Sequence, residues 1–151
     1  MTVLMSGQGG RLFKVLREER SLAYSVTMGA DAFADGGMIY GRIETSPSKI
    51  DEAIRGMREE LSRLRDEALD SAEIARAKAR LAGQMQVSMQ TGGARASLTL
   101  RDELLGRGYR YGLDFPDRFA AVTAQQIQRL AERLLRAEHE VVVVARPAAG
   151  E

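Results

Sequence analysis

The sequence predicts an α+β fold in which an antiparallel or mixed sheet is packed on one face by helices, as in a metalloprotease-like α/β roll. A segment near the start alternates apolar and polar residues and then reaches a glycine-rich turn, which indicates a β-hairpin over residues 23–44. The middle of the chain repeats apolar residues at helical spacing, and a β-branched run stands near the end. Strands grouped beside a block of helices are typical of a layered α+β domain.

The first expected elements are a helix and the hairpin that follows it. The helix should run from Arg11 to about Arg20 and lead directly into a strand that carries Tyr24. From Tyr24 onward, apolar and polar residues alternate with a period of two, as in a strand with one buried face. The run 35–37, Asp-Gly-Gly, is a strong turn signal, and residues 38–44 then form the return strand.

The middle of the chain should be helical from Ser46 onward. Ser46 is expected to cap a helix that has Pro47 in its first position. The apolar stripe of this helix ends at Ala68. Asp70 then caps a second helix, with Glu73 at the third position, and this divides one long helical pattern into two.

Three shorter helical segments are expected next. Thr91 and the two glycines after it interrupt the second helix, and a new helix should cover residues 94–105 before two further glycines end it. Residues 109–119 are expected to be helical but broken by Pro116. Thr123 opens the last helix with a capping box.

Val141–Val144 is predicted to form a strand that is buried on both faces, because its β-branched residues are continuous rather than alternating. Such a strand needs neighbours on each side, and only three strands are evident. The chain also opens abruptly on the apolar patch Val3–Met5. Residues 1–151 are therefore expected to be a single domain that lacks its first strand or strands.

Composition limits the classes of function. The 151 residues carry a formal net charge of +1, which argues against a dedicated surface for nucleic acid or anionic membranes. The absence of cysteine excludes disulfides, thiolate metal sites and thiol catalysis. No apolar run reaches membrane-spanning length and no signal peptide is evident, while cytoplasm and periplasm both stay open.

Several patterns have a simpler structural interpretation. His139 is the only histidine and lacks the partners of a zinc site, so we expect a surface or structural role. The run Gly7–Gly10 lacks the Lys-Ser or Lys-Thr of a phosphate loop and is interpreted as a flexible corner. The charged run 55–67 is interpreted as a solvated helix face.

Arg17 and Tyr24 are the candidate functional residues. They should lie on either side of the corner between the first helix and the first strand. A guanidinium and a phenol can each bind a peptide backbone or stabilise a developing oxyanion. The alternative is that Arg17 lies on a helix surface and Tyr24 fills a half-buried strand position.

The sequence around this corner resembles the C-terminal-type domain of the pitrilysin/insulinase family of zinc metallopeptidases, which includes processing-peptidase-like bacterial enzymes. The resemblance rests on residues 10–26 (GRLFKVLREERSLAYSV), on Gly36–Tyr40, on the helix from Glu73 to Gly83, and on Val122–Ile127. These pieces follow the family's order, and together they span residues 6–146.

The resemblance implies a split active site. Zinc, its histidine ligands and the general base would lie in a partner N-terminal domain or subunit, and this chain would close an enclosed chamber over an extended peptide. Arg17 would hold a substrate carbonyl, and Tyr24 would donate to the substrate backbone or to the oxyanion. No catalytic or metal-binding residue and no cofactor are expected in this chain, which alone should be inactive. Val3–Met5 would be the end of an earlier helix.

Two other functions stay open. One is a proteolytically inactive structural or assembly subunit of the same fold, as in the core subunits of some respiratory complexes. The other is an unrelated α+β module with a small-molecule pocket. The expected partners are the zinc-bearing domain and an extended peptide, with a homo-oligomer as a further option and with neither nucleic acid nor membrane.

Overall fold

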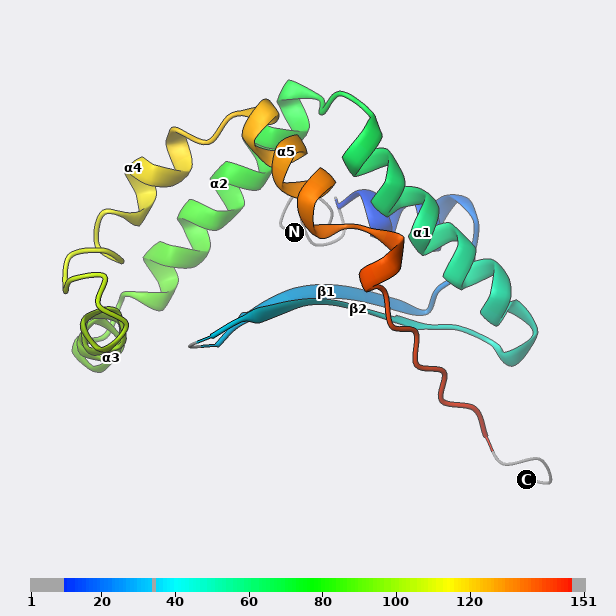
Figure 1. Cartoon of the computed structure of the whole chain (residues 1–151), viewed down its shortest axis with the longest axis horizontal. Helices are drawn as coiled ribbons and strands as arrows, with labels where there is room; N and C mark the ends of the chain where they lie inside the picture. The colour runs from blue at the N-terminus through cyan, green and yellow to red at the C-terminus, as the bar shows by residue number, and fades with distance from the viewer. Residues whose placement is uncertain (1–9, 34, 148–151) are drawn as a thin grey trace.

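The computed structural model describes residues 10–33 and 35–147. Its helices lie above a β-hairpin, and α3 and α4 stand at the end of the molecule farthest from α1 (Figure 1). The elements in chain order are the π-helix η2 (Phe13–Glu19), β1 (Ser25–Ala32), β2 (Gly37–Glu44), the 3-10 helix η3 (Pro47–Lys49), α1 (Ile50–Asp66), α2 (Ser71–Ser88), α3 (Gly92–Leu104), α4 (Phe115–Ala120), α5 (Ala124–Leu134) and the 3-10 helix η4 (Ala137–His139).

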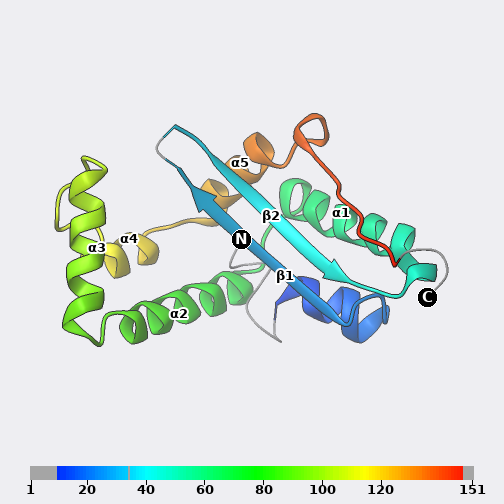
Figure 2. The same cartoon turned by 90° about the horizontal axis from the view of Figure 1, so that it is seen from below.

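The predicted hairpin is confirmed. β1 and β2 pair antiparallel, with Ser25 opposite Glu44 and Val26 opposite Ile43. Val26 and Ile43 pack toward the helices, as the alternation predicts. Seen from below, the opposite face of the hairpin lies in front of the helices, and no described element covers it (Figure 2). The α+β class with helices on one face of the sheet is therefore confirmed.

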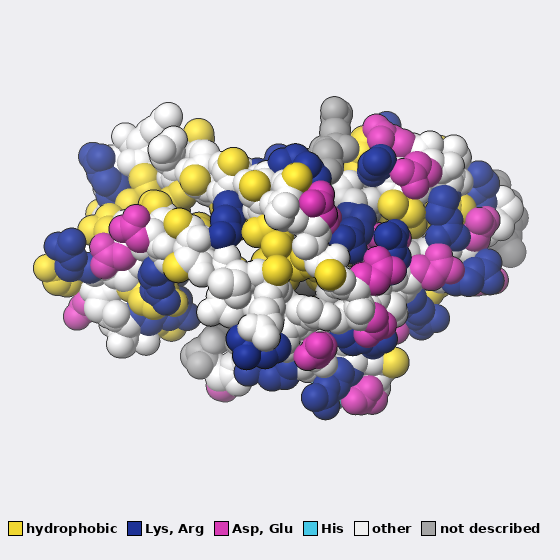
Figure 3. Space-filling model, turned by 90° about the horizontal axis from the view of Figure 1, so that it is seen from above, with side chains coloured by type: hydrophobic (Ala, Val, Ile, Leu, Met, Phe, Trp, Pro, Cys, Tyr) yellow, Lys and Arg dark blue, Asp and Glu magenta, His cyan; other side chains and the backbone are white. Residues whose placement is uncertain are grey.

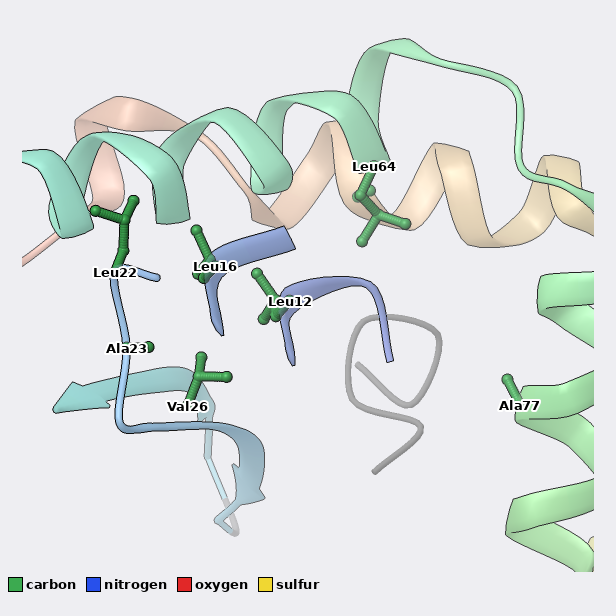
Figure 4. Close-up of a cluster of buried hydrophobic side chains, with 8 residues drawn as sticks. Leu12, Leu16, Leu22, Ala23, Val26, Leu64 and Ala77 are labelled. Atoms are coloured by element: carbon green, nitrogen blue, oxygen red, sulfur yellow. The ribbon is translucent and has the colours of Figure 1, made fainter. Parts of the chain in front are cut away.

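The core lies between η2, α1 and the hairpin (Figure 4). Leu12 and Leu16 are fully buried, as their spacing of four residues predicts. Leu22 and Val26 extend this cluster into the hairpin, and Leu64 extends it into α1. η2 is thus held against α1 by the side chains on either side of Arg17.

A buried ionic network joins this core to α2. Arg11 donates from Nε and Nη2 to the two carboxylate oxygens of Glu73, at 3.2 and 2.7 Å. Glu60 on α1 is only 2% exposed and accepts from Arg63 Nη1 at 2.9 Å, with Arg11 Nε at 4.0 Å. Buried charged side chains need partners of opposite charge. This network therefore fixes the position of the start of α2 relative to α1.

The predicted caps are largely confirmed. Asp70 accepts from the backbone N–H of Ala72 at 3.1 Å, and Thr123 forms a capping box with Gln126. Thr91 caps α3, which therefore begins at Gly92 rather than at residue 94. Ser46 occupies the predicted cap position, but its side chain makes no capping hydrogen bond, and a 3-10 turn precedes α1.

The expected break at Pro116 is wrong. Residues 109–114 form turns, and α4 begins at Phe115 with Pro116 in its first turn. Proline lacks an N–H and has φ already set for a helix, so it suits the first turn, where that N–H has no partner. Pro116 therefore starts a helix rather than interrupting one.

The predicted strand over Val141–Val144 is also wrong. This segment has no strand partner among the described residues, and Val141 and Val143 are 85% and 88% exposed. Val142 and Val144 are about half as exposed. β-branched residues favour an extended backbone, but a strand also needs hydrogen bonds to a neighbouring strand. β2 pairs only with β1 among the described residues and is not a partner for Val141–Val144.

Two predictions lie outside the described residues, namely those for Val3–Met5 and for Gly7–Gly9 in the glycine-rich run. The charged run 55–67 belongs mainly to α1, where side chains of both signs intermix on the upper face (Figure 3). Within the described part of the chain, no helix combines the length and the apolar character that crossing a membrane requires.

Candidate functional site

Arg17 lies in the last turn of η2, whose i→i+5 hydrogen bonding makes it wider than an α-helix. Its guanidinium stands over the ring of Phe13, with Cζ 4.9 Å from the ring centroid. This cation–π contact orients the side chain without neutralising its charge. Among the described residues, Arg17 forms no ion pair, so its N–H donors stay available to a ligand.

The helix ends where the sequence predicts, and Ser21 is the residue that turns the chain. Ser21 has φ of +51°, in the left-handed region that non-glycine residues seldom adopt. The N–H of Leu22 then donates to the carbonyl of Leu16 at 2.7 Å, and the N–H of Arg20 donates to that of Val15 at 3.1 Å. These bonds satisfy the last helix carbonyls and redirect the chain toward the hairpin.

Tyr24 stands just before the first strand rather than inside it, because β1 begins at Ser25. Its backbone N–H still donates to the carbonyl of Glu44 at 2.8 Å, which extends the hairpin ladder by one bond. The side chain is 70% exposed. The interpretation of Tyr24 as a half-buried strand residue is therefore wrong, and its hydroxyl is accessible from solvent.

Arg17 and Tyr24 line the same pocket, so the structure brings the two predicted residues together. The pocket is an open depression in the surface, not an enclosed cavity, and has a volume of about 360 Å³. Its floor is set by Leu22 and Ala23, both buried, which link the helix to the strand. The complete lining is Arg17, Ser21, Leu22, Ala23, Tyr24, Thr45, Ser46 and Lys49.

Sequence reasoning missed the far wall of this pocket, which Thr45 and Lys49 provide together with Ser46. Ser46 was expected only as a helix cap. The pairing of Ser25 with Glu44 places Tyr24 beside Thr45, and the turn of η3 returns Lys49 to the same place. A hairpin register assumed from the turn could have found Thr45. Nothing in the local sequence marks Lys49.

The other candidates do not form a site. His139 is exposed in η4, in agreement with a surface role. Across residues 10–33 and 35–147, no cluster of three or more His, Cys, Asp or Glu side chains could hold a metal ion, so this part of the chain does not fit zinc. A second pocket of similar volume lies between α3 and α4, where the guanidinium of Arg118 stacks on Tyr111 at 3.7 Å.

The charge pair at the end of α1 lies apart from the pocket. Arg65 donates to both carboxylate oxygens of Asp66 at 2.7 Å. These hydrogen bonds lower the pKa of Asp66 below its ordinary value and raise that of Arg65. Both groups lie at the surface and have no part in the pocket lining.

Two solved structures with the same fold are described as inactive peptidase domains. The inactive peptidase domain of a protein assigned as a zinc protease from Bordetella parapertussis matches with a TM-score of 0.78 and 19% identity, over 91% of this chain and 74% of that chain. A peptidase M16 inactive domain from Pseudomonas fluorescens matches with a TM-score of 0.78 and 18% identity, over 89% of this chain and 34% of that chain.

Curated relatives carry the name of uncharacterized zinc proteases. The protein from Streptomyces coelicolor is 31% identical over 134 residues, which cover 89% of this chain and 29% of the relative. The protein from Mycobacterium leprae is 30% identical over 144 residues, which cover 95% and 32%, respectively. The protein from Bacillus subtilis is 25% identical over 145 residues, covering 95% and 35%. The chain thus spans about a third of the length of these relatives.

The family model described as the peptidase M16 inactive domain matches residues 1–81. This match covers η2, the hairpin, α1 and the first part of α2, and so includes the complete pocket lining. It also rules out the unrelated small-molecule module considered from the sequence. The chain therefore belongs to the family of peptidase M16 inactive domains.

Proposed function

We propose that this chain is the substrate-binding, non-catalytic C-terminal portion of a zinc-dependent peptidase, and that residues 1–151 act as one domain in that role. The observation that carries the proposal is the shared pocket of Arg17 and Tyr24. A partner N-terminal domain or subunit would hold the zinc ion and carry out peptide hydrolysis. This chain would close the opposite wall of the chamber and bind the substrate.

The chemistry of the two side chains supports this role. Arg17 presents a fixed set of N–H donors that suits a peptide carbonyl. Tyr24 lines the same pocket and presents one O–H donor, which can bind a second carbonyl or an oxyanion. Because the backbone turned at Ser21 carries both residues, the positions from which the two side chains extend are set before the substrate arrives.

The hairpin offers a second means of binding an extended peptide. Within the described residues, β1 and β2 pair only with each other, so each keeps one free edge of backbone N–H and C=O groups. An extended peptide can add a strand to such an edge. Tyr24 and Glu44 lie at the end of the ladder nearest the pocket, so a peptide on the edge would lead toward Arg17.

The exposed surface is consistent with a partner domain. The chain exposes 10,220 Å², whereas a compact protein of 16.6 kDa exposes about 7,600 Å². Part of the excess is apolar and lies on the uncovered hairpin face, where Met38 and Tyr40 are exposed, and on the extended segment Val141–Val144. We expect part of this surface to be covered by the zinc-bearing domain.

The test is peptide hydrolysis by the full-length protein that contains both domains. Arg17→Ala should lower kcat/KM by roughly a hundredfold and Tyr24→Phe by tenfold or more, on the scale of losing one oxyanion donor. The matched controls are Arg133→Ala, on the exposed side of α5, and Tyr109→Phe, at the other pocket. Both controls should retain the unmodified rate.

A structural or assembly subunit of the same fold is the competing function. It predicts that Arg17→Ala and Tyr24→Phe leave hydrolysis unchanged in an active complex, or that no peptide is hydrolysed by the unmodified protein. The exposed apolar surface is compatible with an assembly role as well, but such a role gives the pocket no function. Equal rates in variants and controls would therefore decide for the assembly role.

A further inference from the structure

Arg20 lies at the corner between η2 and β1, and the proposed function gives it no role. It is the C-cap residue of η2 and stands directly before the left-handed Ser21. Its side chain is only 30% exposed and is not part of the pocket lining. The charge of Arg20 is therefore directed at the protein rather than at a ligand in the pocket.

The side chain of Arg20 lies on one face of α1. Its Nη1 donates to Glu59 Oε2 at 2.5 Å, and its Nη2 lies 4.0 Å from Glu52 Oε1. Gly56 lies on the same face between the two glutamates, because residues three and four apart are neighbours along a helix. A Cβ atom on Gly56 would lie 3.2 Å from Arg20 Nη1. The absence of a side chain at Gly56 thus leaves room for the guanidinium, with a carboxylate on either side.

This ion pair links the corner to a different element from its backbone hydrogen bonds. The N–H of Arg20 donates to the carbonyl of Val15, and the N–H of Leu22 donates to that of Leu16, so both bonds join the corner to η2. The Arg20 side chain instead reaches α1, and Glu59 lies 39 residues further along the sequence. Leu16 and Leu22 approach α1 at the same Gly56. Apolar and ionic contacts therefore meet at one point of α1.

We propose that Arg20 is a positioning residue for peptide binding, and that its ion pair with Glu59 holds the corner on α1 so that Arg17 and Tyr24 line one pocket. Apolar contacts are non-directional, whereas a charge-assisted hydrogen bond has a preferred length and direction. The ion pair therefore sets where along α1 the corner lies. This inference rests on the proposed function, because that function makes Arg17 and Tyr24 the residues that bind the peptide.

The first test is peptide hydrolysis by the full-length protein that contains both domains. Arg20→Met should lower kcat/KM by roughly three- to tenfold, because a displaced binding group loses part of its contact and the ion pair itself is partly exposed. Arg20→Lys keeps the charge and should retain most of the rate. The matched control is Arg58→Met, which removes an ion pair between the same helix and Glu140 and should leave the rate unchanged.

The second test separates positioning from a general loss of folded protein. Arg20→Met is introduced into the double variant Arg17→Ala, Tyr24→Phe, in which both side chains that Arg20 positions have lost their hydrogen-bonding groups. The effect of Arg20→Met should then disappear, because residues that act through one another are not additive. A general loss of folded protein would instead lower the rate by the same factor in both backgrounds.

Amide hydrogen exchange gives a readout that does not depend on hydrolysis. Peptides that cover residues 20–24 contain the amides of Leu22 and Tyr24, which donate to Leu16 and Glu44. In Arg20→Met these amides should exchange roughly threefold faster or more, because the corner opens locally more often. Peptides from α3 should be unchanged, and Arg58→Met should leave residues 20–24 unchanged as well.

Three results would overturn the inference alone. They are a loss of hydrolysis in Arg17→Ala while Arg20→Met behaves like Arg58→Met, an effect of Arg20→Met that persists in the double variant, and unchanged exchange over residues 20–24. Failure of the proposed function looks different. In that case Arg17→Ala and Tyr24→Phe leave hydrolysis unchanged, while exchange still measures whether Arg20 holds the corner.

Discussion

Gly56 determines how closely α1 approaches the helix that carries Arg17. It is buried on α1, and a Cβ atom placed on it would lie 2.8 Å from Leu16 Cδ2, 3.2 Å from Arg20 Nη1 and 3.4 Å from Leu22 Cδ1. Leu16 is fully buried, so its methyl group cannot swing into solvent. Gly83 on α2 is the matched control, because it is exposed and a Cβ there meets nothing within 4 Å.

Both substitutions replace a helical glycine by alanine, but only Gly56→Ala also adds a methyl group to the packed core. Gly→Ala inside a helix stabilises by about 0.5–1 kcal/mol, and this applies to both Gly83→Ala and Gly56→Ala. Overpacking a well-packed core costs about 1–3 kcal/mol, and this applies only to Gly56→Ala. The free energies of unfolding of the two variants should therefore differ by about 1–3 kcal/mol, with Gly83→Ala the more stable.

Urea unfolding followed by far-ultraviolet circular dichroism measures this difference, provided that both variants unfold with the same m value. Thermal unfolding provides a second measurement, at roughly 2–4 °C for each kcal/mol in a chain of this size. The reasoning fails if Gly56→Ala raises the midpoint as much as Gly83→Ala does. That outcome would mean that Leu16 has room to move and that η2 is not seated tightly against α1.

Three further predictions concern local chemistry. Ser21→Gly should stabilise the chain by up to about 1 kcal/mol in urea unfolding, because glycine adopts a φ of +51° without strain; an equal loss would contradict this. Thr123→Ala should cost about 1 kcal/mol, whereas Ser46→Ala should cost almost nothing, because only the threonine side chain makes capping bonds; equal losses would refute the assignment. Arg65→Met should raise the pKa of Asp66 toward 3.8, as measured by NMR titration of its carboxyl group. In the unmodified chain, the ion pair stabilises the fold at pH values above the unfolded-state pKa of Asp66, and this stabilisation is lost as the pH falls through the lower pKa of the folded state. The unfolding midpoint of Arg65→Met should not show this pH dependence. An unchanged titration of Asp66 would contradict the pairing.

The parts of the fold that the sequence predicts well are those that depend on neighbouring residues. Asp70 and Thr123 cap helices because a short polar side chain reaches an amide two or three residues away. The hairpin follows from alternation and one turn. Arg17 and Tyr24 share a pocket because a single left-handed residue, Ser21, lies between their elements, although the sequence does not reveal that serine adopts this conformation.

The parts that were missed depend on contacts between distant segments. Val141–Val144 has the composition of a central strand, but whether it pairs depends on a sheet edge elsewhere in the chain. Thr45 and Lys49 reach the pocket only through the register of β1 with β2 and the turn of η3. Neither contact leaves a periodic signal in the sequence. A hairpin register assumed from the turn could have found Thr45, but nothing local marks Lys49.

The geometry of the site follows from how its two walls are supported. Arg17 is fixed through Leu16, which packs under α1, whereas Tyr24 is fixed through its backbone bond to Glu44 in the hairpin. The link between the walls is Leu22 and Ala23, and both are buried in the same core. A short, buried link cannot stretch without opening the core, so the distance between the backbones of Arg17 and Tyr24 is set by packing rather than by the bound ligand. We therefore expect substitutions in this link to weaken binding by both residues together.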